Sequence, residues 1–207
     1  MKKLILLMVV LTVMINNSNA QDSGILFGLK AGSNYSNQYD SKGGTFTSDA
    51  KFGFAGGAFL ALSIGKFIGV QPEVLFSQKG FIAKGTVLGT SYDLNRTTNY
   101  IDVPLFLAIK PASFVTIVLG PQYSYLLKQK DVFTNALFTT EQTKEFNNDN
   151  IRKNVLGFVG GVDINLKNVV IGARVGRDFQ NNNGDGTSTT PRYKNAWVQA
   201  TLGLRVF

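Results

Sequence analysis

The segment from Val115 to Ser124 alternates apolar side chains with small or polar ones along its whole length. Successive side chains of a β-strand point to opposite faces, so this pattern predicts a strand with one apolar and one hydrated face. That combination is typical of a closed barrel that meets lipid on its outside and encloses a hydrated lumen. The apolar positions are Val115, Ile117, Leu119, Pro121 and Tyr123.

The same alternation recurs along most of the chain and predicts eight strands. Strands of about ten residues can cross a bilayer at a tilt, and closing them into a barrel satisfies every backbone hydrogen bond. We therefore predict an all-β fold, an eight-stranded antiparallel transmembrane β-barrel with up-and-down meander connections. The predicted strands are Ile25–Tyr35, Lys51–Ile64, Phe67–Lys79, Tyr92–Ile109, Phe114–Leu127, Arg152–Leu166, Val169–Phe179 and Arg192–Phe207.

Connections of two lengths alternate along the predicted barrel. Short turns are expected at Gly65–Lys66, Lys110–Ser113 and Lys167–Asn168, and the other connections run over about 12 to 25 residues. Outer-membrane barrels of Gram-negative bacteria have short periplasmic turns and long extracellular loops. An even number of strands places both termini on the short-turn side. The sequence therefore predicts a bacterial outer-membrane protein with both termini in the periplasm.

The residues that face outward on this register form long apolar rows. A soluble, lipocalin-like ligand-binding barrel would have the opposite arrangement, with apolar side chains inside and polar ones outside. It is the main structural alternative and would fractionate with the periplasm rather than with membranes. The clearest outward rows comprise Phe52, Phe54, Ala58, Leu60, Leu62 and Ile64; Ile68, Val70, Val74 and Phe76; Ile101, Val103, Leu105, Leu107 and Ile109; and Leu156, Phe158, Val162, Ile164 and Leu166.

Three bases and three acids fall on the inward positions. They are Lys30, Glu73, Asp102, Asp163, Arg174 and Arg205. An ionised side chain away from water is costly unless it is paired or hydrated, and eight strands enclose an interior only wide enough for side chains. We therefore predict a structural charge network that closes the lumen. A small ion channel lined by these charges is the alternative.

The first twenty residues have the three parts of a secretory signal peptide. Lys2 and Lys3 precede the apolar stretch Leu4–Ile15, and a small-x-small sequence ends at Ala20. A membrane anchor is disfavoured because this stretch is shorter than the roughly 20 residues that span a bilayer. We therefore expect cleavage after Ala20, which divides the chain into a signal peptide, residues 1–20, and a barrel domain, residues 21–207.

Several kinds of chemistry are missing from the sequence. It has no Cys, which excludes disulfides, and no His, which removes the usual general base of hydrolases and the commonest transition-metal ligand. We expect no enzyme activity, no catalytic residue, no metal site and no cofactor. A lipid-modifying enzyme built on a carboxylate pair of Glu73 and Asp102 is the alternative. The net charge of +8 does not arise from a basic cluster with interleaved aromatics, so no nucleic-acid partner is expected.

The stretch Tyr100–Leu105 reads Tyr-Ile-Asp-Val-Pro-Leu and is followed by a turn at Lys110–Pro111. It resembles the Tyr-Ile-acidic-apolar-Pro-Leu strand of the PorT-like outer-membrane β-barrel family of Bacteroidota. The stretches Phe27–Gly32, Gly69–Gly80 and Leu202–Phe207 are similar to that family's first, third and last strands, so the resemblance covers the mature chain. It implies a small outer-membrane β-barrel, and the family's named member assists a secretion apparatus.

These features together predict an integral outer-membrane β-barrel with a closed, salt-bridged lumen. It is expected to act through its extracellular loops or as an accessory of an envelope or secretion complex. Its other expected partners are outer-membrane lipids, lipopolysaccharide and the barrel-assembly machinery, which recognises aromatic ends such as Phe207, and the barrel is expected to be a monomer. The longest loop, Lys128–Ile151, carries Phe133 and other aromatics that are expected to fold back over the barrel mouth, with a partner-binding surface as the alternative.

Overall fold

Extended strands account for nearly all of the chain that the computed structural model describes, which is residues 24–42, 47–87, 90–135, 139–144, 151–183 and 192–206. None of these residues forms a helix long and apolar enough to cross a membrane. The strands are β1 (Ile25–Lys42), β2 (Thr47–Ser63), β3 (Ile68–Val87), β4 (Thr90–Ala112), β5 (Val115–Asn135), β6 (Thr139–Lys144), β7 (Asn154–Leu166), β8 (Val169–Asp178) and β9 (Arg192–Arg205).

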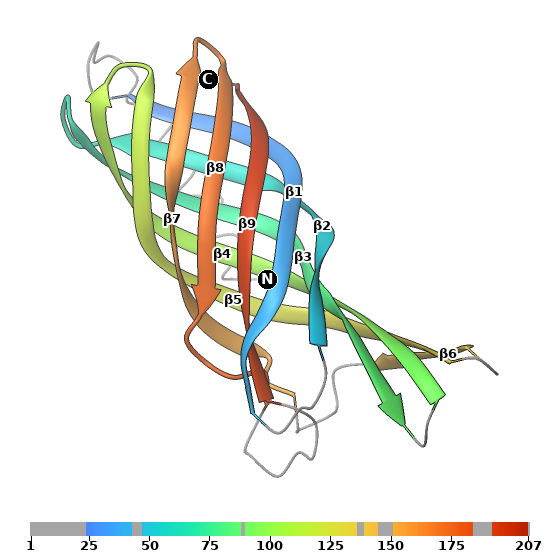
Figure 1. Ribbon diagram of the computed structural model, residues 1–207. Helices are drawn as coiled ribbons and strands as arrows, with labels where there is room; N and C mark the ends of the chain where they lie inside the picture. The colour runs from blue at the N-terminus through green and yellow to red at the C-terminus, as the bar shows by residue number, and fades with distance from the viewer. Residues whose placement is uncertain are drawn as a thin grey trace, which may run out of the picture.

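Eight of the strands form a closed ring in which each pairs antiparallel with the next along the chain. The ring runs β1-β2-β3-β4-β5-β7-β8-β9, and pairing of β9 with β1 closes it, for example at Lys30 opposite Gly203. The remaining strand, β6, pairs with β5. The predicted fold, an eight-stranded antiparallel barrel with up-and-down connections, is confirmed (Figure 1).

The two ends of the barrel differ. Tight connections join Ser63 to Ile68, Ala112 to Val115 and Leu166 to Val169 at one end, which we call the turn end. Gly65 and Lys167 have the positive φ values, 144° and 51°, that tight reversals often need. We call the opposite end the hairpin end, because the β3–β4 and β5–β6 hairpins project beyond the ring there (Figure 1). Short turns are thus confirmed in all three places, although the one predicted at Lys110–Ser113 falls at Ser113–Phe114 because β4 continues to Ala112.

Three of the predicted long connections are wrong, because the strands continue through them. β1 runs on to Lys42 and β2 begins at Thr47, where a connection was expected between Tyr35 and Lys51. The ladder between β3 and β4 runs on to the pair Val87 and Thr90. β5 extends to Asn135 and pairs with β6, so the first part of the expected loop Lys128–Ile151 is a β-hairpin. Alternation of apolar and polar residues is required only where one face of a strand is apolar and the other hydrated. Backbone hydrogen bonds continue the ladder without that pattern.

Large apolar side chains cover the outside of the ring, whereas its interior holds most of the buried polar side chains together with an apolar cluster. Val74 on β3 and Leu105 on β4 face outward and are 54% and 53% exposed. Glu73 and Asp102, on the opposite faces of the same two strands, are buried inside. Most residues of the predicted outward rows are exposed or half-buried in this way. A soluble ligand-binding barrel has the reverse arrangement, so this alternative is not supported.

Two features predicted from the sequence lie outside the described residues. They are the signal peptide at residues 1–20 and the terminal Phe207. The described strands, from Ile25 to Arg205, all fall within the predicted barrel domain, residues 21–207.

Candidate functional site

Five buried polar side chains meet in the lumen near the turn end, and we call them the turn-end cluster. Lys30 Nζ lies 2.6 Å from Glu73 Oε1, and Arg174 Nη2 lies 2.8 Å from Asp163 Oδ1 and 3.7 Å from Glu73 Oε1. The amide nitrogen of Gln71 donates to Glu73 Oε1 at 2.9 Å and to Asp163 Oδ2 at 3.2 Å. The cluster therefore joins two bases and two acids through shared contacts.

Aromatic rings extend the turn-end cluster and help to fill the lumen. Lys30 Nζ is 5.2 Å from the ring centroid of Phe59, and the Arg174 guanidinium carbon is 5.4 Å from that of Phe106. Cations above aromatic faces gain electrostatic stabilisation, most of all where water is excluded. Phe106 also packs with Val118 and Trp197 in an apolar cluster inside the barrel. The lumen at this level contains side chains in close contact.

A second ion pair, which the sequence analysis missed, lies further along the lumen. Lys79 Nζ lies 3.0 Å from Asp102 Oδ2, and it also lies 3.7 Å from the Trp197 ring centroid and 5.0 Å from that of Tyr100. The side chains of Lys79 and Asp102 are each 1% exposed. Lys79 is six residues after Glu73 on the same strand and therefore on the same face, which is the signal that could have identified it.

A third ion pair, also missed, lies toward the hairpin end. Arg96 and Asp131 are directly opposite on β4 and β5 and form a bidentate pair, with Nε–Oδ1 and Nη2–Oδ2 distances of 2.7 and 2.9 Å. Gln129 donates to Asp131 Oδ2 at 3.1 Å. The guanidinium carbon of Arg96 lies 5.6 Å from the ring centroids of Phe81 and Tyr193. Bidentate geometry makes this a strong pair.

The structure does not bring all of the predicted network together. Asp102 pairs with Lys79 rather than with the turn-end cluster, and Glu73 and Asp102 each have a cationic partner of their own. Arg205 lies half-buried at the rim of the turn end, where its guanidinium donates to Lys167 O at 3.2 Å and to the side-chain oxygen of Asn165. The other four predicted residues all belong to the turn-end cluster.

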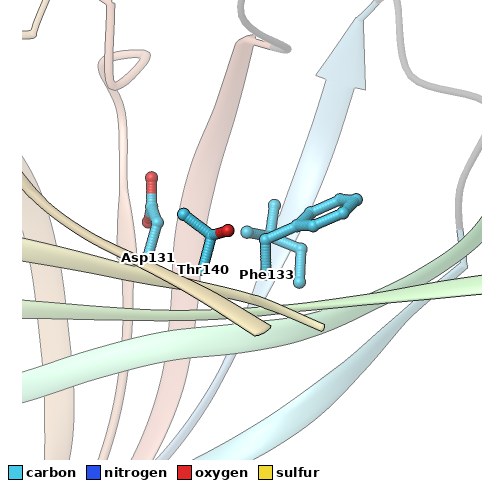
Figure 2. A pocket seen from close by; sticks show the side chains of 4 residues that line it. Asp131, Phe133 and Thr140 are labelled. Atoms are coloured by element: carbon cyan, nitrogen blue, oxygen red, sulfur yellow. The ribbon is translucent and has the colours of Figure 1, made fainter. Parts of the chain in front are cut away.

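A pocket of about 310 Å³ opens at the hairpin end, above the Arg96–Asp131 pair. It is lined by Leu94, Asp131, Phe133 and Thr140, and Figure 2 shows the last three projecting from the same face of the β5–β6 hairpin. The ring of Phe133 stacks on Tyr92, with centroids 5.1 Å apart and planes at 20°. Phe133 is half-buried by this contact with the neighbouring hairpin, and the other aromatics that were expected to fold over the barrel mouth lie outside the described residues.

An exposed ion pair joins β2 to the projecting β3–β4 hairpin. Lys84 Nζ lies 3.1 Å from Asp49 Oδ2, and this hydrogen bond and the charge of Asp49 raise the pKa of Lys84. Exposed pairs of this kind contribute little to stability. Within the described ranges, no group of three or more acidic, His or Cys side chains is placed to hold a metal ion.

In a closed ring of strands, every backbone hydrogen-bonding group can be paired within the protein, and an apolar outside with paired charges in the lumen suits a lipid environment. The fold and the lumen therefore define an integral membrane β-barrel. The chain belongs to the outer membrane protein beta-barrel domain family, whose model matches residues 18–184. This family places the protein in the bacterial outer membrane.

Several solved barrels are similar to this chain. The attachment invasion locus protein Ail of Yersinia pestis has a TM-score of 0.48 and 15% identity, covering 88% of this chain and 99% of its own. A major outer membrane protein of Thermus thermophilus has a TM-score of 0.49, 15% identity and the same two coverages. Neisserial surface protein A has a TM-score of 0.45 and 14% identity, covering 90% and 99%. No curated protein matches the sequence.

Proposed function

We propose that this protein is a monomeric, non-catalytic outer-membrane barrel that conducts no ions and acts through its projecting hairpins. The observation that carries this proposal is that β3, β4 and β5 continue as a regular sheet beyond a ring whose lumen is filled by buried ion pairs. The resemblance to the PorT-like family favours a role as an accessory of an envelope or secretion complex.

The orientation of the barrel is part of the proposal. Short turns in outer-membrane barrels face the periplasm and the longer connections face outward, so the turn end and both termini would be periplasmic. Residues 1–20 would direct export and then be cleaved, which leaves the barrel domain, residues 21–207. The hairpin end would then present the pocket beside Phe133 to the cell exterior.

Buried pairs support a lumen closed to ions. A permeating ion would have to displace Lys30 from Glu73 and Lys79 from Asp102, all of which are buried. Breaking such a pair leaves a charge without its partner in a medium of low polarity, which costs several kcal/mol. Eight strands also leave little room beyond that occupied by side chains.

The purified barrel is expected to show no discrete conductance in a planar bilayer, because its buried ion pairs occupy the lumen at three levels. Single-channel recording measures this directly, with a wide-pore barrel as the positive control. Recovery of the heat-dependent gel shift from the same membranes would establish that folded protein was inserted. Steps of conductance that change when Glu73→Gln is introduced would instead support the ion-channel alternative.

The tip of the β3–β4 hairpin can be removed while the residues that pair with β2 or pack around Tyr193 are kept. Lys84 and Asp93 are paired on β3 and β4, so replacing residues 85–92 by Asn-Gly would close the hairpin with a two-residue turn. If the hairpins bind an envelope partner, this variant is expected to fold and to lose a companion protein that co-purifies with the wild type. Quantitative mass spectrometry of complexes isolated from native envelopes in mild detergent measures the loss.

A matched change at the turn end provides the control. Replacing Lys167–Asn168 by Asn-Gly alters a two-residue connection in which Asn can adopt the positive φ of Lys167, and the companion is expected to remain bound at the wild-type level. If the variant with the shortened β3–β4 hairpin retained the companion protein, this would contradict the proposal that the hairpin binds it. A wild-type barrel that co-purifies with no stoichiometric protein would contradict the accessory role.

A further inference from the structure

A groove of about 640 Å³ crosses the outer surface of β7, β8, β9 and β1, which lie side by side in the ring (Figure 1). Its walls include the outward side chains of Tyr35, Phe158, Val175 and Val198, which are exposed. These residues belong to the apolar rows that face lipid, so the groove lies on the lipid-facing side of the barrel and not in the lumen.

Part of the groove exists because a glycine, which has no side chain, lies in the outward row. Gly160, Val175, Val198 and Tyr35 are successive partners across the four strands and form one outward row. A Cβ added at Gly160 would meet only Val118 O, at 3.7 Å, so the surface at this position is open. The row therefore has a depression at Gly160 between the larger side chains of neighbouring positions.

The next row toward the hairpin end marks the limit of the apolar surface. It consists of Phe158, Arg177, Ala196 and Asn37, which are again successive partners across the four strands. Lys194 is two residues before Ala196 in the sequence and lies on the same face of β9, nearer the hairpin end. Polar side chains thus replace apolar ones on β8 and β1 at this height, and on β9 two residues further toward the hairpin end, as expected where acyl chains give way to headgroups.

Arg177 is the charged member of the groove. It is exposed, and its guanidinium carbon lies 5.9 Å from the ring centroid of Phe179. Among the residues that the structure describes, no carboxylate lies within ion-pair distance of Arg177. A guanidinium presents several donors in a planar fork that matches phosphate geometry. An apolar channel that ends at such a cation is complementary to a lipid with a phosphate headgroup.

We propose that this groove binds a phosphorylated membrane lipid, with one acyl chain over Gly160 and the phosphate on Arg177. The acyl chain packs against Phe158, Val175 and Val198, and Lys194 adds positive charge beside the phosphate. The site is on the outer wall and is independent of the lumen and of the role assigned to the projecting hairpins. Loss of lipid binding would therefore leave the proposed function standing, and the reverse also holds.

Two single substitutions test the site without disturbing the fold. Gly160→Val fills the depression in a position where a Cβ fits, and Arg177→Gln removes an exposed charge. Purified barrels would be equilibrated in mixed micelles with diphosphoryl lipid A or with diacylglycerol, which has acyl chains but no phosphate, and native mass spectrometry would count the lipids retained. Wild type is expected to retain about fivefold more lipid A than Arg177→Gln, the effect of about one interfacial charge, and also more than Gly160→Val, in which the acyl chain loses its space.

Matched controls separate the groove from general effects of bulk and charge. Ala173→Val adds bulk to the outer face of β8 outside the groove, and Lys66→Gln removes an exposed charge at the turn end, so both are expected to retain lipid A as wild type does. Equal retention of diacylglycerol and lipid A by the wild-type barrel would overturn the proposal. Unchanged retention in both Gly160→Val and Arg177→Gln would also overturn it.

Discussion

Replacing Arg174 by Met is expected to destabilise the barrel by about 3 to 5 kcal/mol, because it leaves a buried acid without its cation. Asp163 has Arg174 as its ion-pair partner in the turn-end cluster, whereas Glu73 also contacts Lys30. Trp197 is the single tryptophan and is buried in the lumen, so its fluorescence reports unfolding. Urea titration of the barrel folded in lipid vesicles gives the change in free energy.

A double variant tests whether the loss comes from the unpaired acid. Adding Asp163→Asn to Arg174→Met removes the uncompensated charge while Gln71 can still donate to position 163. We expect the double variant to be more stable than Arg174→Met alone, with a coupling energy of about 1 to 3 kcal/mol. Strictly additive losses would show that the two residues do not act as a pair.

Gly32→Ala is expected to destabilise the barrel by about 3 kcal/mol or to prevent its closure, because the added methyl group has no space. A Cβ at Gly32 would lie 1.9 Å from Ala200 O, which is backbone of β9 across the closing seam of the ring. Strands β1 and β9 would have to separate at this point. Urea titration and the fraction of protein with a heat-dependent gel shift measure the two outcomes.

Gly160→Ala is the matched control for Gly32→Ala. Both glycines lie within strands of the ring, but a Cβ at Gly160 meets no atom closer than 3.7 Å. We expect this variant to fold with a free energy of unfolding equal to that of wild type or about 0.5 kcal/mol higher, since Ala loses less backbone entropy than Gly. Equal destabilisation by both substitutions would exclude the close approach of β1 and β9 as the cause.

Where a strand lies between lipid and lumen, its position in the sequence and the side to which each side chain points could be predicted. The contrast between these two media imposes a period of two, which is visible at Val115–Ser124 and places Glu73 and Asp163 inside. The pattern failed at the hairpin end. The pairing register of β5 shifts at Leu127, so the inward-facing residues are Leu126 and then Gln129 instead of Lys128. Strict alternation counted from the membrane region therefore assigns the residues after Leu127, including Asp131, to the wrong face.

The sequence by itself determined the class of fold, the three short turns and the polar character of the lumen, because each depends on local pattern and on the medium that the strand faces. Only the tertiary structure decided which charges pair. Arg174 on β8 reaches Glu73 on β3 across the lumen, and Asp102 pairs with Lys79 instead of joining them. These contacts depend on how the strands are staggered when the ring closes, and a one-dimensional alternation carries no information about that stagger.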